Sequence, residues 1–475
     1  MDYDCGFAKI LVNPYNLYFQ IFGMLERNSM HAIRNGRIVL NDKILDGCAL
    51  LFDRKIIGIV SRETLDSAWE KGKCWQGKPL TLTDARGAYV SPGFINLHIH
   101  GCAGADTMDA TEDTLAVMSR FLVQTGVTAF LPTTMTCAKA DVYKALQRIR
   151  ETMTVITRRR DEKHEPAQTE RKPAIEAVNI SDTPSSEHFP AASGISAKTE
   201  EEKHCLLPGA KVLGAYLEGP FISRQYKGAQ KEEFITQADF AFIKDFADVI
   251  KVVVLAPETL KDAITRGEFI EQCRTHHMIV SLGHSAAEYD TALQAIREGA
   301  SHVTHLCNAM TGLHHRNPGL LGAALDSSAM CELIADDLHV HPAVQRLIYR
   351  TKGAAGIELI TDSMRACGLP DGISELGGQT VYVKDGSARL ADGTIAGSVV
   401  ALNRAMANFR NNTGATVPEV VRMVTENQAQ ELGLFEKIGS LSPGAAADIT
   451  LFNENFTVLN TFVDGCEVYN NPAFR

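Results

Sequence analysis

Short apolar segments of this chain repeatedly end in a histidine or a carboxylate, and this arrangement constrains the fold more than any other feature. The residues at these segment ends are His98, His100, Glu218, His284, His305 and Asp362. Amphipathic segments of helical periodicity alternate with the apolar ones, as at 111–124 and 286–298. This alternation predicts a (β/α) barrel, in which side chains at the carboxyl ends of the parallel strands form the active site.

The pair His98 and His100 is the centre of a predicted metal site. Residues two apart in an extended strand point to the same face, so both imidazoles can bind one ion. Glu218, His284 and His305 can complete the ligand set. Neutral imidazole and carboxylate suit Zn²⁺, and Fe²⁺ is also compatible. A His-x-His pair alone equally fits two polar residues on an exposed strand, but the repeated placement favours a metal centre.

Two further residues are candidates for chemistry and one for substrate binding. A carboxylate beside a metal-activated water can take its proton and return it to a leaving group, which is the role expected of Asp362. His339 follows another short apolar segment and can polarise a carbonyl. Arg316 can bind an anionic group, because a guanidinium suits phosphate, although an ordinary surface arginine is the alternative. The chain contains no GxSxG motif, so a covalent serine mechanism lacks support.

Composition excludes several classes of function. The 475 residues carry a net charge of −10, so the chain offers no general attraction for nucleic acid or acidic membranes. No run of 18 or more apolar residues occurs, and we expect no membrane span. The 11 cysteines form no C-x-x-C pair and indicate free thiols in a reducing compartment, the cytoplasm.

The chain divides into a barrel and a smaller β domain. Short strand-like segments near both ends predict that the two ends pair into one β domain, and Asn35-Gly36 is a hairpin signal. The segment 157–207 is rich in charge, Pro and Ser and predicts a disordered surface insertion. The expected boundaries are 1–29 for an N-terminal extension, 30–92 and 436–475 for the β domain, and 93–435 for the barrel.

These motifs together resemble the amidohydrolase superfamily, and within it the N-acetylglucosamine-6-phosphate deacetylases. The segments that carry the resemblance include PGFINLHIHG, LGAYLEGPFIS, SLGHSAA, THLCNAM, NPGLLGAAL, IADDLHVHP, LITDSM and IGSLSPGAAADITLF. The resemblance implies an α/β fold: a (β/α)8 TIM-like barrel with a small β-sandwich domain formed by both chain ends. It also implies a divalent metal cofactor, Zn or Fe, with one or two ions per subunit, and a homodimer.

The resemblance assigns a role to each matching residue. Glu218, His284 and His305 match the ligands common to the family, whereas His98 and His100 match members that hold a second ion. Asp362 matches the catalytic acid/base, and His339 the residue near the acetamide carbonyl. The residues that match substrate contacts are Ala229, Gln230, Asn308, Ala309, Arg316, His339, Ala396 and Gly397. One departure is Gln230, which stands where the family usually has a histidine that contacts substrate.

The expected reaction is hydrolysis of N-acetylglucosamine 6-phosphate to glucosamine 6-phosphate and acetate, in amino-sugar catabolism. An alternative keeps the metal site but changes the substrate to another amide or a cyclic ureide. Members such as dihydroorotases bridge their metals with a modified lysine, whereas this chain offers Glu218, which disfavours that alternative. A non-catalytic scaffold is disfavoured because every expected ligand is present.

Overall fold

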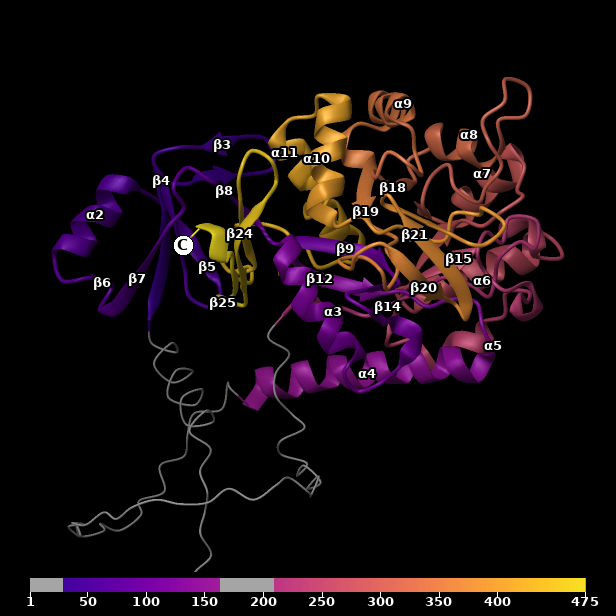
Figure 1. Cartoon of the computed structure of the whole chain (residues 1–475), viewed down its shortest axis with the longest axis horizontal. Helices are drawn as coiled ribbons and strands as arrows, with labels where there is room; N and C mark the ends of the chain where they lie inside the picture. The colour runs from indigo at the N-terminus through magenta and orange to yellow at the C-terminus, as the bar shows by residue number, and fades with distance from the viewer. Residues whose placement is uncertain (1–28, 163–208, 475) are drawn as a thin grey trace, which may run out of the picture.

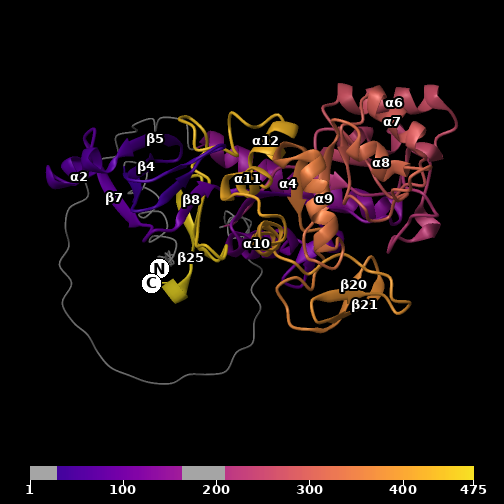
Figure 2. The same cartoon turned by 90° about the horizontal axis from the view of Figure 1, so that it is seen from above.

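The computed structural model describes residues 29–162 and 209–474 (Figure 1). The role expected of residues 1–29 as an extension therefore lies outside the described residues, apart from the last residue. Seen from above, the strands from both chain ends lie at one end of the molecule and α6 to α8 at the other (Figure 2). Within the described ranges, we find no helix with the length and apolar character needed to cross a bilayer.

The larger part of the molecule is built on parallel strands. They are β9 (Phe94–Ile99), β12 (Val127–Pro132), β13 (Lys211–Val212), β14 (Ala215–Leu217), β15 (Ile250–Leu255), β16 (Ile279–Leu282), β17 (His302–Val303), β18 (Met330–Ile334) and β19 (Ile357–Ile360). They form the sheets β13-β12-β9 and β14-β15-β16-β17-β18-β19. Parallel bridges Thr133↔Tyr216 and Ile99↔Ser363 join the two sheets at both sides. This arrangement confirms the predicted α/β, TIM-like class.

Helices connect these strands, as the alternating pattern predicted. The helices are α3 (Thr114–Leu122), α4 (Lys139–Glu162), α5 (Phe240–Ile243), α6 (Ala263–Thr275), α7 (Tyr289–Glu298), α8 (Gly319–Leu325), α9 (Pro342–Lys352), α10 (Leu402–Thr413), α11 (Val417–Arg422) and α12 (Glu426–Glu431). Gly126 and Gly299 follow η2 (Val123–Thr125) and α7 with positive φ angles of 83° and 122°. Glycine adopts this backbone without a steric penalty, which explains why the helices end there.

The start predicted for the insertion was wrong. Helix α4 runs to Glu162, so residues 157–162 continue a helix that begins at Lys139. Arginine and glutamate are good helix formers, and this local preference outweighs the charged composition that suggested a loop. The remainder, 163–207, lies outside the described residues.

Two more sheets contain strands from the beginning of the chain, and one of them also contains its end. Their order is β5-β4-β1-β7-β6 and β25-β24-β23-β8-β2-β3. The strands are β1 (Met30–Arg34), β2 (Arg37–Val39), β3 (Ile44–Leu45), β4 (Cys48–Phe52), β5 (Ile56–Ser61), β6 (Cys74–Trp75), β7 (Lys78–Asp84), β8 (Tyr89–Pro92), β23 (Ile449–Phe452), β24 (Val458–Val463) and β25 (Cys466–Asn470), with helix α2 (Arg62–Glu70) after β5. Strand β8 pairs with β2 on one side and with β23 on the other.

The hairpin predicted at Asn35-Gly36 was wrong. Strands β1 and β2 flank this turn, but β1 pairs with β4 and β7, whereas β2 pairs with β3 and β8. Asn35 does adopt the left-handed backbone expected of a turn, with φ 56°. The turn therefore carries the chain from one sheet to the next. Each of the two strands pairs with strands from elsewhere in the chain and not with the other.

Smaller strands lie near the barrel rim. They are β10 (Gly101–Cys102), β11 (Ala105–Asp106), β20 (Gly372–Leu376), β21 (Gln379–Lys384) and β22 (Ser387–Arg389). Strands β20, β21 and β22 form an antiparallel sheet that follows β19 in the chain.

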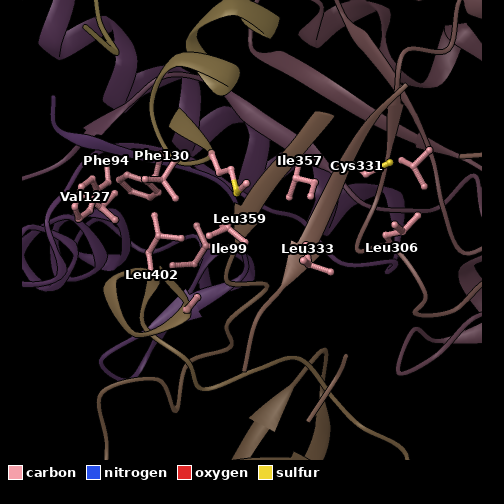
Figure 3. Close-up of a cluster of buried hydrophobic side chains, with 14 of the residues drawn as sticks. Phe94, Ile99, Val127, Phe130, Leu306, Cys331, Leu333, Ile357, Leu359 and Leu402 are labelled. Carbon is pink, nitrogen blue, oxygen red and sulfur yellow. The ribbon is translucent and has the colours of Figure 1, made fainter. Parts of the chain in front are cut away.

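The main apolar core lies between the parallel strands and the helices that cover them (Figure 3). On β15, Val253 and Leu255 belong to this core, whereas Val252 and Val254 belong to a second cluster of buried residues. Successive residues of a strand point to opposite faces, so both faces of β15 are buried. The barrel strands are therefore apolar almost throughout, and the polar residues inside them stand out.

Phe452, the last residue of strand β23, packs this strand against the barrel, and we expect its replacement to lower stability substantially. Its buried ring lies 5.3 Å from the ring of Tyr89, 5.7 Å from Phe94 and 5.1 Å from Phe456, measured between centroids. We expect Phe452→Ala to lower the free energy of unfolding by about 3–5 kcal/mol, as for other buried aromatic truncations. Urea unfolding followed by circular dichroism measures this change. Tyr382→Ala, at a half-exposed position, is the control and should change stability little.

Candidate active site and metal centre

The six residues predicted at strand ends do lie at strand ends. His98 belongs to β9 and His100 follows it, and Glu218 follows β14 directly. His284, His305 and Asp362 each stand two residues beyond a strand and have positive φ angles of 47°, 30° and 47°. Left-handed backbone is uncommon for residues other than glycine and concentrates at functional sites. The strained turns bring the three side chains to the same end of the barrel.

Glu218 lies at the centre of the six side chains. Its Oε1 is 3.2 Å from His284 Nε2, 3.1 Å from His305 Nε2 and 3.5 Å from His98 Nε2. Its Oε2 is 3.2 Å from His100 Nε2. Among these six side chains, two groups can therefore hold an ion, and Glu218 belongs to both: His98, His100 and Glu218 form one, and Glu218, His284 and His305 form the other.

Asp362 faces the first of these groups. Its Oδ1 lies 3.2 Å from His100 Nε2 and 3.5 Å from His98 Nε2. Burial raises the pKa of Asp362, and the two histidines lower it by a larger amount, so the pKa lies below its usual value. The side chain is thus a carboxylate at neutral pH. It keeps some contact with solvent, with 12% of its surface exposed, whereas His98 is fully enclosed.

The side chains present fit a divalent cation. The Nε2 atom of His98 is buried without a hydrogen-bond partner and faces the carboxylates of Glu218 and Asp362. Burial raises the pKa of Glu218, and His284, His100 and His305 lower it, with a net shift well below the usual value. Carboxylate oxygens and imidazole nitrogens are the donor atoms that Zn²⁺ and Fe²⁺ prefer.

Gln230 contacts a predicted metal ligand. Its side-chain amide donates to Glu218 Oε2 at 2.6 Å, and its carbonyl accepts from the backbone N–H of Thr136 at 2.7 Å. The side chain is buried. Both ends of the amide are therefore engaged within the protein, and the contact with Glu218 could not be read from the sequence.

Most of the other predicted substrate contacts lie beside the same strand ends, whereas Arg316 is exposed to solvent. A Cβ atom added to Gly397 would meet the backbone oxygen of Asp362 at 3.1 Å, and Ala396 precedes it. Ala309 lies near Gly228 and His284, and its carbonyl accepts from the Ser285 backbone N–H. The remaining positions are Ala229, whose carbonyl accepts from Gln379, Asn308, whose amide donates to the His305 carbonyl, and Arg316, which is exposed.

Comparison with known proteins places this arrangement in a family. The amidohydrolase family profile matches residues 89–468, most of the chain. The chain belongs to the amidohydrolase family. It is 36% identical over 379 residues to the N-acetylglucosamine-6-phosphate deacetylase of Bacillus subtilis, covering 79% of this chain and 83% of the relative. It is 33% identical to the N-acetylgalactosamine-6-phosphate deacetylase of Escherichia coli O157:H7, covering 82% and 89%. The resemblance drawn from the motifs is confirmed.

Solved structures agree with this assignment. The crystal structure of N-acetylglucosamine-6-phosphate deacetylase from Pasteurella multocida superposes with a TM-score of 0.75 at 30% identity, covering 93% of this amidohydrolase and 100% of that chain. The Thermotoga maritima structure with the same description gives 0.72 at 28% identity, with the same coverage.

Sequence reasoning missed a residue that orients His339. Asp336 accepts from His339 Nδ1 at 2.6 Å and from the His339 backbone N–H at 2.8 Å. Burial raises the pKa of Asp336, and His339 lowers it by more, so the carboxylate is ionised. The signal was present in the sequence, because an aspartate three residues before the histidine can close such a turn.

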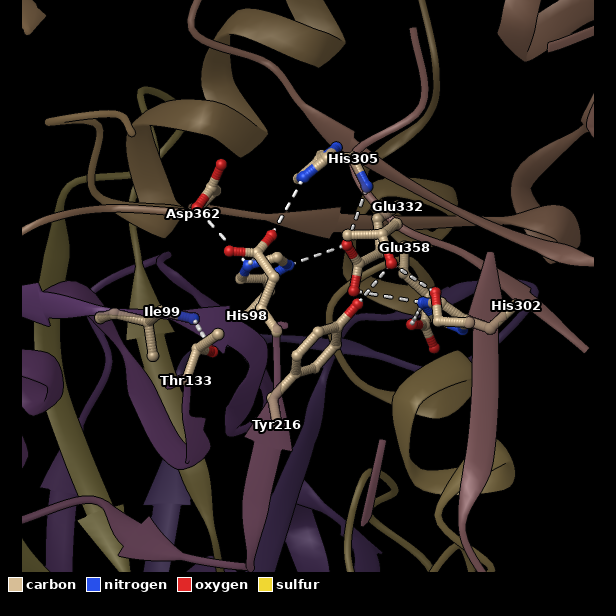
Figure 4. A network of polar contacts seen from close by, with 12 residues as sticks. His98, Ile99, Thr133, Tyr216, His302, His305, Glu332, Glu358 and Asp362 are labelled. Atoms are coloured by element: carbon tan, nitrogen blue, oxygen red, sulfur yellow. Dashed lines mark hydrogen bonds and ion pairs between the residues drawn. The ribbon is translucent and has the colours of Figure 1, made fainter. Parts of the chain in front are cut away.

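Sequence reasoning also missed the polar network inside the barrel of this amidohydrolase (Figure 4). Glu332 on β18 and Glu358 on β19 are paired in register and completely buried. His302 lies between Glu332 and Glu431. A carboxylate within an otherwise apolar strand was a visible signal, since burying a charge is costly unless it is paired. Its partners come from other strands and could not be predicted.

Proposed function

We propose that this amidohydrolase deacetylates N-acetylglucosamine 6-phosphate, giving glucosamine 6-phosphate and acetate. The proposal is supported chiefly by the two ligand groups that share Glu218 beside Asp362, at the strand ends of a TIM-like fold. The Bacillus subtilis relative, which aligns over 83% of its length, carries this activity in its name. The alternative of a cyclic ureide substrate has no support from the described residues.

We assign Glu218, His284 and His305 as ligands of a divalent ion, and His98 and His100 with Glu218 as ligands of a second. A divalent ion bound there supplies Lewis acidity, which polarises a carbonyl and acidifies water. Zn²⁺ and Fe²⁺ both fit the donor atoms. The four histidines must bind through unprotonated nitrogen, so ion binding releases any protons they carry.

Asp362 is the proton carrier in this proposal. Its carboxylate takes a proton from the attacking water and returns it to the amine nitrogen that leaves. Asp336 orients the ring of His339 through Nδ1, which leaves Nε2 to contact the acetamide. The overall charge of −10 gives an anionic substrate no general attraction, so the 6-phosphate needs a local cation. In this proposal Arg316 supplies that cation. Ala229, Gln230, Asn308, Ala309, Ala396 and Gly397 are proposed to line the sugar.

Acetate release tests the proposed function. We expect purified protein to release acetate from N-acetylglucosamine 6-phosphate, with kcat/KM about 10–100-fold lower for the sugar without phosphate, because a charge-assisted contact is lost. Chelation should abolish release, and added Zn²⁺ or Fe²⁺ should restore it. The 6-phosphate of N-acetylgalactosamine serves as the comparison substrate. Equal rates with and without phosphate would contradict the role of Arg316, and no release by metal-loaded protein would contradict the reaction.

The same proposal covers the assembly and domains. We propose a complete (β/α)8 barrel at 93–435, with 30–92 and 436–475 forming one β-sandwich domain; the shared sheet of β8 and β23 supports this division. We further propose a homodimer, as the resemblance implies. A cytoplasmic location is supported by the buried free thiols of Cys102, Cys273, Cys331 and Cys367.

A further inference from the structure

Glu332 is a buried charge that the proposed reaction does not use. It lies in the middle of β18, completely buried, on a strand whose other residues are apolar. An ionised carboxylate in such a place costs several kcal/mol unless its oxygens are matched by donors. The contacts of the Glu332 carboxylate therefore indicate its role in the barrel.

One oxygen of Glu332 contacts both groups of predicted metal ligands. Oε2 lies 3.0 Å from His98 Nδ1 and accepts from the His305 backbone N–H at 2.9 Å. His98 belongs to the first ligand group and His305 to the second. The two residues come from β9 and from the end of β17, far apart in the chain. Glu332 thus holds two separate strand ends in a fixed relation.

The contact with Glu332 also determines which ring nitrogen of His98 carries no proton. A carboxylate oxygen accepts, so the proton of the His98 imidazole lies on Nδ1. The lone pair is then on Nε2, the buried atom that faces Glu218 and Asp362 without a hydrogen-bond partner. His284 is arranged similarly, with Nδ1 at 2.8 Å from the Tyr226 carbonyl oxygen. A carboxylate acceptor makes the imidazole a stronger ligand than a carbonyl does.

The other oxygen of Glu332 faces a compensating group. Oε1 lies 3.2 Å from Nε2 of His302, and Nδ1 of His302 contacts Glu431. Burial lowers the pKa of His302, and the two carboxylates raise it well above its usual value, so the ring is a cation. The positive charge on the side away from the metal ligands balances Glu332 without competing for His98.

We propose that Glu332 is a positioning residue that prepares His98 as a ligand of the second ion. This inference rests on the metal centre of the proposed function, including its second ion, and adds to it the residue that secures that ion. Glu332 touches neither substrate nor ion. It acts through the orientation of His98 and the position of His305.

Zinc titration of metal-free protein, by calorimetry with elemental analysis of the loaded protein, tests the inference. We expect two Zn²⁺ per wild-type subunit. Glu332→Gln can still accept from His98 and His305 but has lost its charge, so the weaker ion should bind about 10-fold less tightly. Glu332→Leu offers no acceptor and should lose about 100-fold or the ion altogether, at the upper end of the effect of such outer contacts. Circular dichroism establishes that each variant is folded.

Glu358→Gln is the matched control. Glu358 lies beside Glu332 in register and is equally buried, but its oxygens have no hydrogen-bond partner. Burial raises its pKa well above the usual value, with Glu431 and Glu332 adding to the rise, so the neutral amide resembles the native group. This variant should retain two ions with wild-type affinity. Loss of the second ion here would overturn the specific role of Glu332.

Two further results would overturn the inference. One is a wild-type subunit that binds a single Zn²⁺ at saturation. The other is unchanged affinity for both ions in folded Glu332→Gln, which keeps the test decisive even if Glu332→Leu does not fold. Acetate release is measured on the same preparations. A protein that binds one ion and still deacetylates the sugar phosphate contradicts this inference alone, whereas a two-ion protein without activity contradicts only the proposed function.

Discussion

Replacing Asp362 with asparagine is expected to lower kcat for acetate release by about 10²–10⁴-fold, the range in which a positioned acid or base contributes. The backbone at this position is fixed, because the Asp362 N–H donates to the His98 carbonyl at 2.9 Å and its carbonyl accepts from Ser398 at 2.8 Å. Asparagine has nearly the same shape and can occupy the same place. It cannot take a proton from water and return it, so the loss should appear in kcat.

Steady-state kinetics on metal-loaded Asp362→Asn checks this prediction. Elemental analysis must accompany the kinetics, because Oδ1 of Asp362 lies 3.2 Å from His100 Nε2 and a loss of metal would lower the rate for a different reason. Ser398→Ala is a useful comparison. Its backbone contact with Asp362 is retained, so any change in its rate measures disturbance of the turn. Near-normal turnover by metal-replete Asp362→Asn would remove Asp362 from the mechanism.

Replacing Glu218 with alanine is expected to remove both ions and to lower activity by at least about 10³-fold, since the Lewis acidity of a bound metal contributes several kcal/mol to catalysis. The reason is geometric: Glu218 is the residue that the two ligand groups share. Its two oxygens face different histidines, with Oε1 toward His284 and His305 and Oε2 toward His100. A single substitution therefore disrupts both groups.

Zinc content measured together with turnover checks this second prediction. His100→Ala and His284→Ala are the controls, because each histidine belongs to one ligand group and each substitution should release one ion at most. A Glu218→Ala protein that retains two ions would show that the groups are independent of the carboxylate. Restoration of activity by excess Zn²⁺ should fail for Glu218→Ala and succeed at least in part for His100→Ala.

The placement of the predicted ligands could be read from the sequence because it depends on local rules. A short apolar strand followed by a polar residue places that residue at a barrel rim, and parallel strands bring all such residues to the same rim. This is why His284, His305 and Asp362 were found together although they are far apart in the chain. Glu218 was predicted as a ligand, but its place in both groups depends on the spacing of strands.

Contacts made across the barrel could not be predicted in the same way. Glu332 is the third residue of a five-residue strand, and the sequence does not indicate that its neighbours are His98 and the backbone of His305. Gln230 was expected near the sugar, and its contact with Glu218 depends on how the loop folds back. The hairpin predicted at Asn35-Gly36 was wrong for a related reason. The chain does turn at these residues, but the pairing of the flanking strands depends on contacts with segments distant in sequence.

Strand β8 has a consequence for the order in which the protein can fold. Its two neighbours in the sheet are β2, made early in synthesis, and β23, which begins at residue 449. While the chain is still on the ribosome, one edge of β8 is therefore unpaired, because β23 lies about 350 residues further along the chain. Until then the unpaired edge must be shielded from pairing with other chains. Nascent chains that lack the last strands should consequently depend on chaperones, whereas the finished protein should not.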